Sequence, residues 1–478
     1  MSVTTAHSYE PVIGLEIHVQ LRTRTKMFCG CEPSFGDEPN VHTCPVCLGL
    51  PGSLPVTNAQ AVHFGLMIAI ALGCEIAPRS IFHRKNYFYP DLPKGYQISQ
   101  YDIPLARNGN LGDVRIHRVH LEEDAAKLVH AGSSGRIHGS EASVVDFNRG
   151  GTPLVEIVTE PDIHSPQQAE DWLRLLRATL RQTGVSDVNM DEGSLRADGN
   201  VSIRPVGEAT LGTKTELKNM NSFRFLRRGL EAEIERQERL LAEGGQVEQE
   251  TLHFDPVSGG LSSLRSKEEA HDYRYFPEPD LVPLAPTAEM LEHAREALPE
   301  LPLERSARLE SELGIPADQA RQFAYNSELG DFFEAALAGD GADARAVANW
   351  AANDLVAKLG DQIPQETRLE AGAFAGLVRM VTAGEVSASA AKEVLEVLVD
   401  EGGDPVAIVA DRGLAKAGGD ELEQIVDQAL AENADAVEKI KGGNEKAIGA
   451  IVGSVMRASK GRADGGEVQR MIKERIGA

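Results

Sequence analysis

The sequence predicts an α+β protein in which an antiparallel-sheet domain with inserted helices precedes an all-helical domain and a small helical tail domain. Across roughly the first 290 residues, short stretches of alternating apolar and polar residues are punctuated by Gly, Pro and Asn, which is typical of antiparallel strands. Beyond Pro286, Ala, Leu and Glu recur at helical spacing. A chain of 478 residues is too long for one core, so we expect three domains, 1–290, 291–403 and 404–478, with the last hinge in DEGGDP at 400–405.

Two helices are expected inside the sheet domain. The first begins with Ser165 as its N-cap and Pro166 in its first turn, and its apolar residues keep helical spacing up to Gly184. The second begins near Ser222 and ends at the glycine pair 244–245. Both helices therefore carry local start and stop signals.

Four cysteines in a short segment have the spacing of a zinc site. Two stand in CGC and two in CPVC, with twelve residues between the pairs: Cys29, Cys31, Cys44 and Cys47. A two-residue turn brings both sulfurs of a Cys-x-x-Cys pair to one ion, and structural disulfides are rare in the cytosol. We expect a zinc lobe over residues 28–48, with His42 as a substitute ligand or unligated thiols as the alternatives. Cys74 follows an apolar run and is expected to be a buried core thiol.

The charge distribution separates the tail from the rest of the chain. The formal net charge of −25 argues against indiscriminate nucleic-acid binding, because such binding needs Lys and Arg against phosphates. From Lys439 to the end, however, nine Lys or Arg stand against four Asp or Glu. This basic segment is either a local RNA-binding surface or a solvated helix face.

The start of the chain lacks a signal-peptide pattern, and no apolar run reaches the roughly 18 residues of a membrane span, so we expect a cytoplasmic protein.

Four strand-like segments each place an acid on a polar face. In GLEIHVQL, residues 14–21, alternation puts Glu16, His18 and Gln20 on one side and aliphatic residues on the other. HRVHLEED, SLRADGNVSI and TKTELKN repeat this alternation, and in the last of them Lys214 and Lys218 share the face of the acid. We therefore expect the four segments to line one side of a single sheet.

The convergent acids predict a magnesium site. Carboxylates that meet without a counter-charge repel one another, and oxygen ligands suit Mg2+. The candidate ligands are Glu16, Glu123, Asp198 and Glu216. Imidazole suits softer ions, so the residues alone place His18 on a phosphate or beside the ligands. A polar cleft without a metal is the alternative interpretation.

Two further segments interleave aromatic and basic residues. Residues 83–101 hold four of the eight tyrosines, and residues 271–283 hold two more. Such segments either stack unpaired bases or pack against each other. The sequence contains neither a Walker loop nor a recognisable nucleophile motif, which argues against a P-loop nucleotide site and a self-contained hydrolase.

Taken together, these strings closely resemble the B-type subunits of the aspartyl/glutamyl-tRNA amidotransferase family. The resemblance runs from residue 11 to about residue 284 through IGLEIHVQL, CPVCLGLPGSLPV, HRKNYFYPDLPKGYQISQY, HLEEDAAK, GTPLVEIVTEPD, DEGSLRADGN, KTELKNMNSF and LRSKEEAHDYRYFPEPDL. The tail string GNEKAIGAIVGSVMRASKGRAD also resembles that family. In RADGN, many relatives carry Cys in place of Ala197 and another small residue in place of Gly199, but Asp198 is kept.

The resemblance implies a cradle-shaped catalytic domain, a helical domain and a tail that contacts tRNA. It implies use of ATP and Mg2+ to phosphorylate the side-chain carboxylate of misacylated Glu-tRNA(Gln) or Asp-tRNA(Asn). Ammonia, released from glutamine by an A-type amidase subunit, then displaces the phosphate. A small C-type subunit is implied as the third member of the heterotrimer.

The resemblance also assigns roles to single residues. The catalytic and magnesium-binding positions it implies are Glu16, His18, Glu123, Asp198 and Glu216. The chemistry of imidazole instead favours His18 on a phosphate or beside the magnesium ligands, so we leave the role of His18 open. Neighbours on the same faces, Gln20, Lys214 and Lys218, are the candidates for nucleotide binding. Two rival functions remain at this stage: a non-catalytic tRNA-binding adaptor with a zinc lobe, and a stand-alone metal-dependent ligase.

Overall fold

The computed structural model describes residues 8–131, 142–266, 273–339, 341, 343–442, 444–459 and 461–477. It divides into two compact units, Met1–Pro302 and Leu303–Ala478. The first unit combines sheets with helices and the second is helical, so the expected mixed α+β class is confirmed. The expected division into three domains stays a prediction. None of the helices in the described ranges is long and apolar enough to span a membrane.

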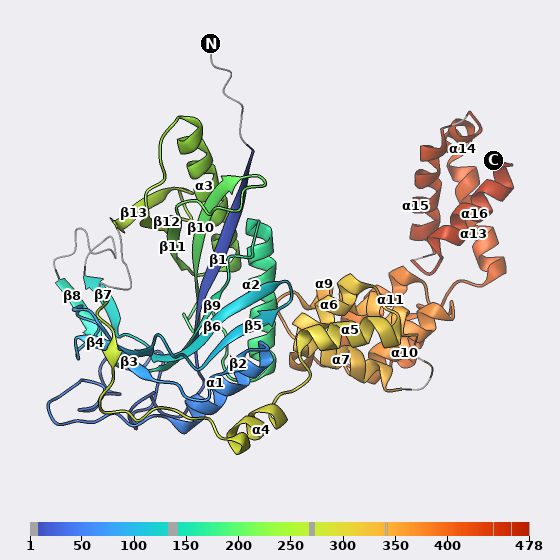
Figure 1. Cartoon of the computed structure of the whole chain (residues 1–478). Helices are drawn as coiled ribbons and strands as arrows, with labels where there is room; N and C mark the ends of the chain where they lie inside the picture. The colour runs from blue at the N-terminus through green and yellow to red at the C-terminus, as the bar shows by residue number, and fades with distance from the viewer. Residues whose placement is uncertain are drawn as a thin grey trace, which may run out of the picture. The chain divides into compact units, whose positions relative to one another are not determined.

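A large sheet organises the first unit (Figure 1). In the described part of the chain it has nine strands, and only the β11·β12 pair is parallel. Its strands, in spatial order, are β13 (Leu261–Ser266), β12 (Glu250–Phe254), β11 (Thr215–Met220), β10 (Leu195–Pro205), β1 (Tyr9–Gln20), β9 (Pro153–Thr159), β6 (Val114–Glu123), β5 (Ala106–Leu111) and β2 (Glu75–Ile76). The expected strand GLEIHVQL lies in the middle of this sheet, so its polar face has neighbours on both sides.

Helices cover the apolar face of the large sheet. Helix α1 (Ala59–Ala71) packs on β6, and α3 (Phe223–Ala242) packs on β10 and beside α2 (Pro166–Gln182). Gly199 of β10 allows this approach, because a Cβ there would lie 3.2 Å from a methyl carbon of Leu230 on α3. Both expected helices are confirmed. Their N-caps are Ser165 and Ser222, and each cap hydroxyl accepts a hydrogen bond from a backbone N–H in the first turn.

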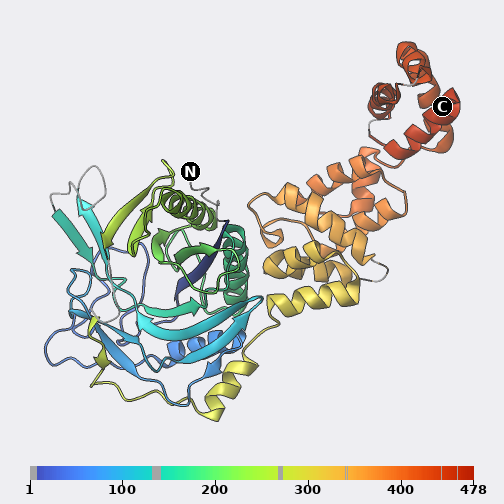
Figure 2. The same cartoon turned by 45° about the horizontal axis from the view of Figure 1, so that its top comes forward.

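A small sheet packs beside the large one (Figure 2). It consists of β14 (Phe276–Pro277), β3 (Phe82–Asn86) and β4 (Tyr96–Gln100), and β4 contacts β6. This pairing brings the two tyrosine-rich segments together although they are far apart in the sequence. In a separate sheet, β7 (Lys127–Ala131) pairs antiparallel with β8 (Ala142–Asp146).

The first unit ends with α4 (Ala288–Glu296), which packs on α1. The helices of the second unit are α5 (Pro302–Leu313), α6 (Ala317–Tyr325), α7 (Ser327–Leu337), α8 (Ala344–Asn349), α9 (Val356–Leu359), α10 (Ala371–Thr382), α11 (Ala388–Asp400), α12 (Pro405–Arg412), α13 (Gly419–Glu432), α14 (Ala434–Lys441), α15 (Ile448–Ala458) and α16 (Gly465–Ile476). A π-helical turn, Trp350–Leu355, joins α8 to α9. Buried apolar side chains form one cluster from Leu309 to Leu414 and another from Ala417 to Ile472.

Candidate active site and cysteine cluster

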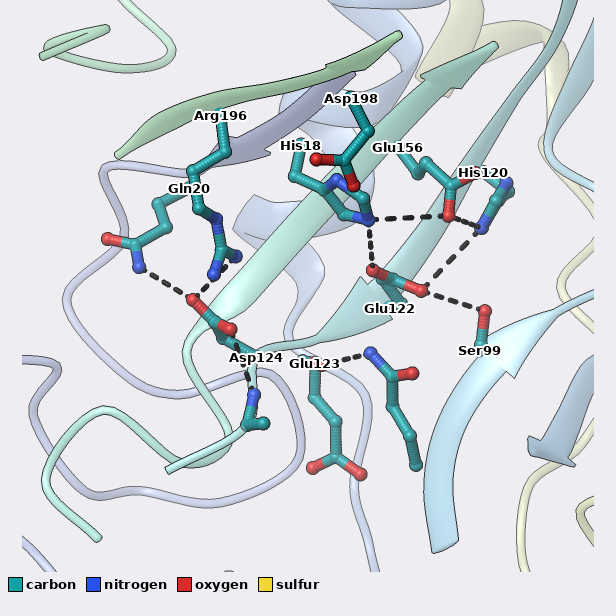
Figure 3. Close-up of polar contacts among 12 residues, drawn as sticks. His18, Gln20, Ser99, His120, Glu122, Glu123, Asp124, Glu156, Arg196 and Asp198 are labelled. Atoms are coloured by element: carbon teal, nitrogen blue, oxygen red, sulfur yellow. Dashed lines mark hydrogen bonds and ion pairs between the residues drawn. The ribbon is translucent and has the colours of Figure 1, made fainter. Parts of the chain in front are cut away.

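Three neighbouring strands bring two histidines and two acids to the polar face of the large sheet. His18 of β1 and His120 of β6 both lie directly opposite Glu156 of β9 in the strand register. Glu122 follows two residues after His120, so alternation keeps it on the same face. These four side chains form the histidine–carboxylate group (Figure 3).

The side chains of this group point toward one another. The Nε2 atom of His18 lies 3.6 Å from a carboxylate oxygen of Glu122 and 3.6 Å from one of Glu156. The Nε2 atom of His120 lies 3.2 Å from Glu156 and 3.6 Å from Glu122, and the Ser99 hydroxyl donates to Glu122 at 3.0 Å. One ligand atom each from His18, Glu122 and Glu156 lie within 4.8 Å of one another. This donor set of two carboxylates and an imidazole fits a divalent cation.

The electrostatics of the group keep its acids ionised. Burial opposes a charge on Glu122 and Glu156, but hydrogen bonding and charge from His120 and His18 hold the pKa of both carboxyls below the ordinary value. Burial likewise opposes a charge on His120, yet the Glu156 charge and hydrogen bonds to both acids raise its pKa to about 9. The carboxylates therefore carry the charge that a cation requires.

A second cluster, the acid–lysine group, adjoins the first across β1, β10 and β11. Glu16 lies opposite Asp198, and Asn200 lies opposite Glu216. The Asn200 amide donates to Glu16 at 3.0 Å. Lys218 lies 3.0 Å from Glu216 and 3.7 Å from Asp198. The pKa of Glu16 is raised, mainly by burial and then by the nearby charges of Glu156, Glu216 and Asp198. Because Glu156 belongs to the first group and the other two acids to the second, Glu16 connects the two groups electrostatically.

Both groups open onto one cavity of about 270 Å³. Its basic lining residues are Lys85, Arg118, Lys214 and Lys218, and its aromatic ones are Tyr101, Tyr273 and Tyr275. The Tyr101 and Tyr275 rings stack 4.3 Å apart, and the Lys85 ammonium lies 4.8 Å from the centre of the Tyr273 ring. The tyrosine-rich segments thus pack against each other and also line the cavity.

Of the expected site residues, four line this cavity: Glu16, Lys214, Glu216 and Lys218. His18 and Asp198 lie behind this lining, 3.6 Å from Glu156 and 3.7 Å from Lys218, whereas Glu123 and Gln20 make their contacts elsewhere. Because side chains alternate along β6, Glu123 points away from Glu122 (Figure 3), ion-paired with Lys94 and accepting the Ile98 N–H at 3.0 Å. Gln20 donates to the buried Asp124 at 2.7 Å.

Sequence reasoning left Glu122 and Glu156 out of the site residues. A signal existed for each. Glu122 shares its strand face with His120, and Glu156 is a lone charge in the apolar stretch PLVEIVT. A single charge in a buried strand requires a partner, which here is the pair of histidines.

The four cysteines of the lobe form one cluster. Their Sγ atoms lie within 4.8 Å of one another, and those of Cys44 and Cys47 are 3.8 Å apart. Zinc–sulfur bonds of about 2.3 Å in a tetrahedron place sulfurs about 3.8 Å apart, so the cluster fits a Zn2+ ion. A hydrogen bond from Cys29 lowers the pKa of Cys47 to about 5, and the same hydrogen bond raises the pKa of Cys29, so the thiols stabilise one thiolate among them. His42 points instead to Asp37, at 2.9 Å.

The basic tail residues differ in their surroundings. Arg475 contacts Asp427 and Glu423 of α13, and Arg462 pairs with Glu421. Lys439 and Lys446 line a hollow of about 660 Å³, which Glu432 and Asp435 also line. Lys460 lies outside the described residues. Part of the basic character of the tail is therefore neutralised by α13.

Known proteins resemble the chain over nearly its whole length. Residues 11–292 match the family model described as the GatB/GatE catalytic domain, and residues 331–476 match the GatB domain. The aspartyl/glutamyl-tRNA(Asn/Gln) amidotransferase B subunit of Moorella thermoacetica is 49% identical over 479 residues, covering 98% of this chain and 100% of its own length. Proteins of the same name from Geobacter sulfurreducens and Frankia casuarinae are 48% and 49% identical, each over 98% of this chain and over 99% and 96% of their own lengths.

Proposed function

The chain belongs to the family of aspartyl/glutamyl-tRNA(Asn/Gln) amidotransferase B subunits, and from that premise we propose that it amidates misacylated tRNA. In this proposal it uses ATP and Mg2+ to phosphorylate the side-chain carboxylate of Glu-tRNA(Gln), Asp-tRNA(Asn) or both. Ammonia then displaces the phosphate to give Gln-tRNA(Gln) or Asn-tRNA(Asn). The observation that carries the proposal is the cavity in which the histidine–carboxylate group adjoins the acid–lysine group.

The chemistry explains why such a cavity is needed. A carboxylate is a poor electrophile, and its phosphorylation brings two anions together. His18, Glu122 and Glu156 would hold the divalent cation, which when bound supplies neutralising charge and orientation. The chain adds cations of its own at Lys85 and Arg118. Burial opposes the Lys85 charge, but Glu122 and Glu156 nearby raise the pKa of Lys85, so it stays protonated and can contact an anionic oxygen.

The nitrogen source is proposed to be a partner. Amidase chemistry needs an activated nucleophile, and the sequence contains no recognisable motif for one. We place the docking site of the A-type amidase subunit on the zinc lobe, and a small C-type subunit would complete the enzyme. Support comes from large apolar side chains, 49–73% exposed, on the lobe and on the segment that directly follows it: Phe35 and Val41, then Leu50, Leu54 and Val56. Exposed apolar clusters of this kind mark protein interfaces.

The tail is proposed to contact the tRNA. Lys439 and Lys446 support this role because they line the same surface hollow. Arg462 and Arg475 support it less, because α13 acids already neutralise them.

The test is an assay of the chain with and without the amidase and small subunits. ATP hydrolysis that depends on Glu-tRNA(Gln) or Asp-tRNA(Asn) is expected with the assembled enzyme, and the chain alone should release no ammonia from glutamine. An adaptor would bind tRNA without hydrolysing ATP. Glutamine-dependent amidation by the lone chain would instead favour a stand-alone ligase.

A further inference from the structure

A fully buried acid, paired with an arginine, lies on the helix-covered side of the sheet, away from the cavity. Glu233 of α3 is 0% exposed, and its carboxylate accepts hydrogen bonds from Thr215 (2.8 Å), Gln237 (2.8 Å) and both Nε and a terminal nitrogen of Arg236 (2.7 and 2.8 Å). Burying such a charge is costly, and apolar residues of similar volume often stabilise a fold at least as well. The network therefore calls for a role besides stability.

The first connection from this network leads to β11. Thr215 is the first residue of β11 and is itself 0% exposed. Because side chains alternate, Thr215 faces the helix while Glu216, the next residue, faces the cavity. The Thr215 hydroxyl that donates to Glu233 thus fixes the backbone directly beside Glu216.

The second connection leads to β12. Arg236, held by Glu233, lies 3.3 Å from Glu250, the first residue of β12. The next residue, Thr251, lies opposite Glu216 in the register and donates to its carboxylate at 3.0 Å. The buried Glu233 carboxylate is therefore connected both to β11, which carries Glu216, and to β12, which carries its hydrogen-bond donor Thr251.

The third connection leads to β10, close to an irregularity in its pairing with β11. The β10·β11 pairing shifts between Ala197 and Gly199, on either side of Asp198. Bulges of this kind re-aim side chains at functional sites. Gln237 donates to the Val201 carbonyl at 3.2 Å, on the residue opposite Thr215. The network thus holds β10, β11 and β12 beside the irregularity.

We propose that Glu233, with Arg236 and Gln237, positions Glu216 and Lys218 for the reaction. This inference rests on the proposed function, since it concerns the same cavity. These are positioning residues, because they are not among the residues that line the cavity and act on it through the buried Thr215 and through Glu250, which does line it.

The test uses Glu233→Gln in the full chain assembled with its amidase and small subunits. Gln keeps the shape but loses the charge that holds Arg236. A misplacement of about 1 Å can cost about 100-fold in rate, so we expect kcat of Glu-tRNA-dependent ATP hydrolysis to fall about 10–100-fold, with KM for tRNA changed less than about twofold. Thr215→Val should reproduce this loss and Thr215→Ser should not. Hydrogen exchange at residues 215–218 should accelerate in Glu233→Gln and Thr215→Val.

Glu231→Gln is the matched control, because Glu231 lies on the same helix with a side chain that is 50% exposed. The inference would be overturned if kcat is unchanged in Glu233→Gln, even with a lowered melting temperature. It would also be overturned if Glu231→Gln loses kcat to the same extent. If Glu233→Gln does not fold, the test is the comparison of kcat between Thr215→Val and Thr215→Ser. If the wild-type enzyme shows no tRNA-dependent ATP hydrolysis, the proposed function is wrong. The positioning role can still be tested in that case, because unchanged hydrogen exchange at residues 215–218 in Glu233→Gln and Thr215→Val would overturn it.

Discussion

Glu156→Gln is the substitution that tests the histidine–carboxylate group most severely. The Glu156 carboxylate lies within 3.6 Å of both His18 and His120 and 3.5 Å from Arg118. The substitution keeps the size of the side chain and removes one of the two negative charges available to a cation. We expect Mg2+ binding and ATP hydrolysis to weaken together.

The magnitude follows from Coulomb's law. Two unit charges about 4 Å apart interact by about 4 kcal/mol at an effective dielectric constant of about 20, and a divalent cation would lose at least that much. The amide oxygen of Gln keeps a dipole at the same place and recovers part of this energy. Since about 1.4 kcal/mol is a factor of ten, we expect Mn2+ or Mg2+ to bind about 100–1000-fold more weakly.

The assay is Mn2+ binding followed by electron paramagnetic resonance, together with the Mg2+ dependence of tRNA-dependent ATP hydrolysis. Glu160→Gln is the control, because Glu160 lies just beyond the same strand with a side chain that is 35% exposed and paired with His117. A Glu156→Gln enzyme with the Mg2+ dependence of the wild type would refute the assignment of this group as the cation site.

Three further predictions concern other parts of the chain. Purified protein should contain about one zinc per chain, which Cys44→Ser should remove and Cys74→Ser should leave, as metal analysis would reveal. Burial and the nearby charge of His293 lower the pKa of His63, whose ring stacks 4.5 Å from that of His293. Because the unfolded chain then binds more protons, thermal stability should fall as pH drops through about 6.5 and below, and His63→Phe should reduce that dependence; an unaltered profile would exclude this stack as its source. In the tail, Lys446→Glu should weaken tRNA binding and lower its salt slope by about one, whereas Arg475→Glu should mainly reduce thermal stability; equal binding losses would contradict the distinction.

The local features of the fold could be predicted from the sequence, but the contacts between distant segments could not. The helix beginning at Ser165 and the cysteine spacing depend on residues a few positions apart, so their signals are complete in the sequence. The alternation in GLEIHVQL correctly separated the His18 face from the aliphatic face, because a strand has a fixed period of two. Stacking of Tyr101 on Tyr275 depends on the pairing of β14 with β3, which no local pattern encodes.

The candidate site shows the same division. HLEED contains adjacent acids, and only strand alternation distinguishes Glu122, on the face of His18, from Glu123, which contacts Lys94. Glu156 joins the group through the register of β9 with β1 and β6, and register depends on the whole sheet. The network of Glu233 was missed because a Glu within a helix is ordinarily exposed, and only packing of α3 on the sheet buries it.

The most direct test of the central claim is isotope transfer from the carboxylate to phosphate. Glu-tRNA(Gln) labelled with ¹⁸O in both side-chain oxygens would be amidated by the assembled enzyme with unlabelled ATP, and the released phosphate would be analysed by mass spectrometry. If the cavity activates the carboxylate as an acyl phosphate, one carboxylate oxygen leaves with the phosphate, so each phosphate released by amidation should carry one ¹⁸O atom. Unlabelled phosphate accompanying normal amidation would contradict the account.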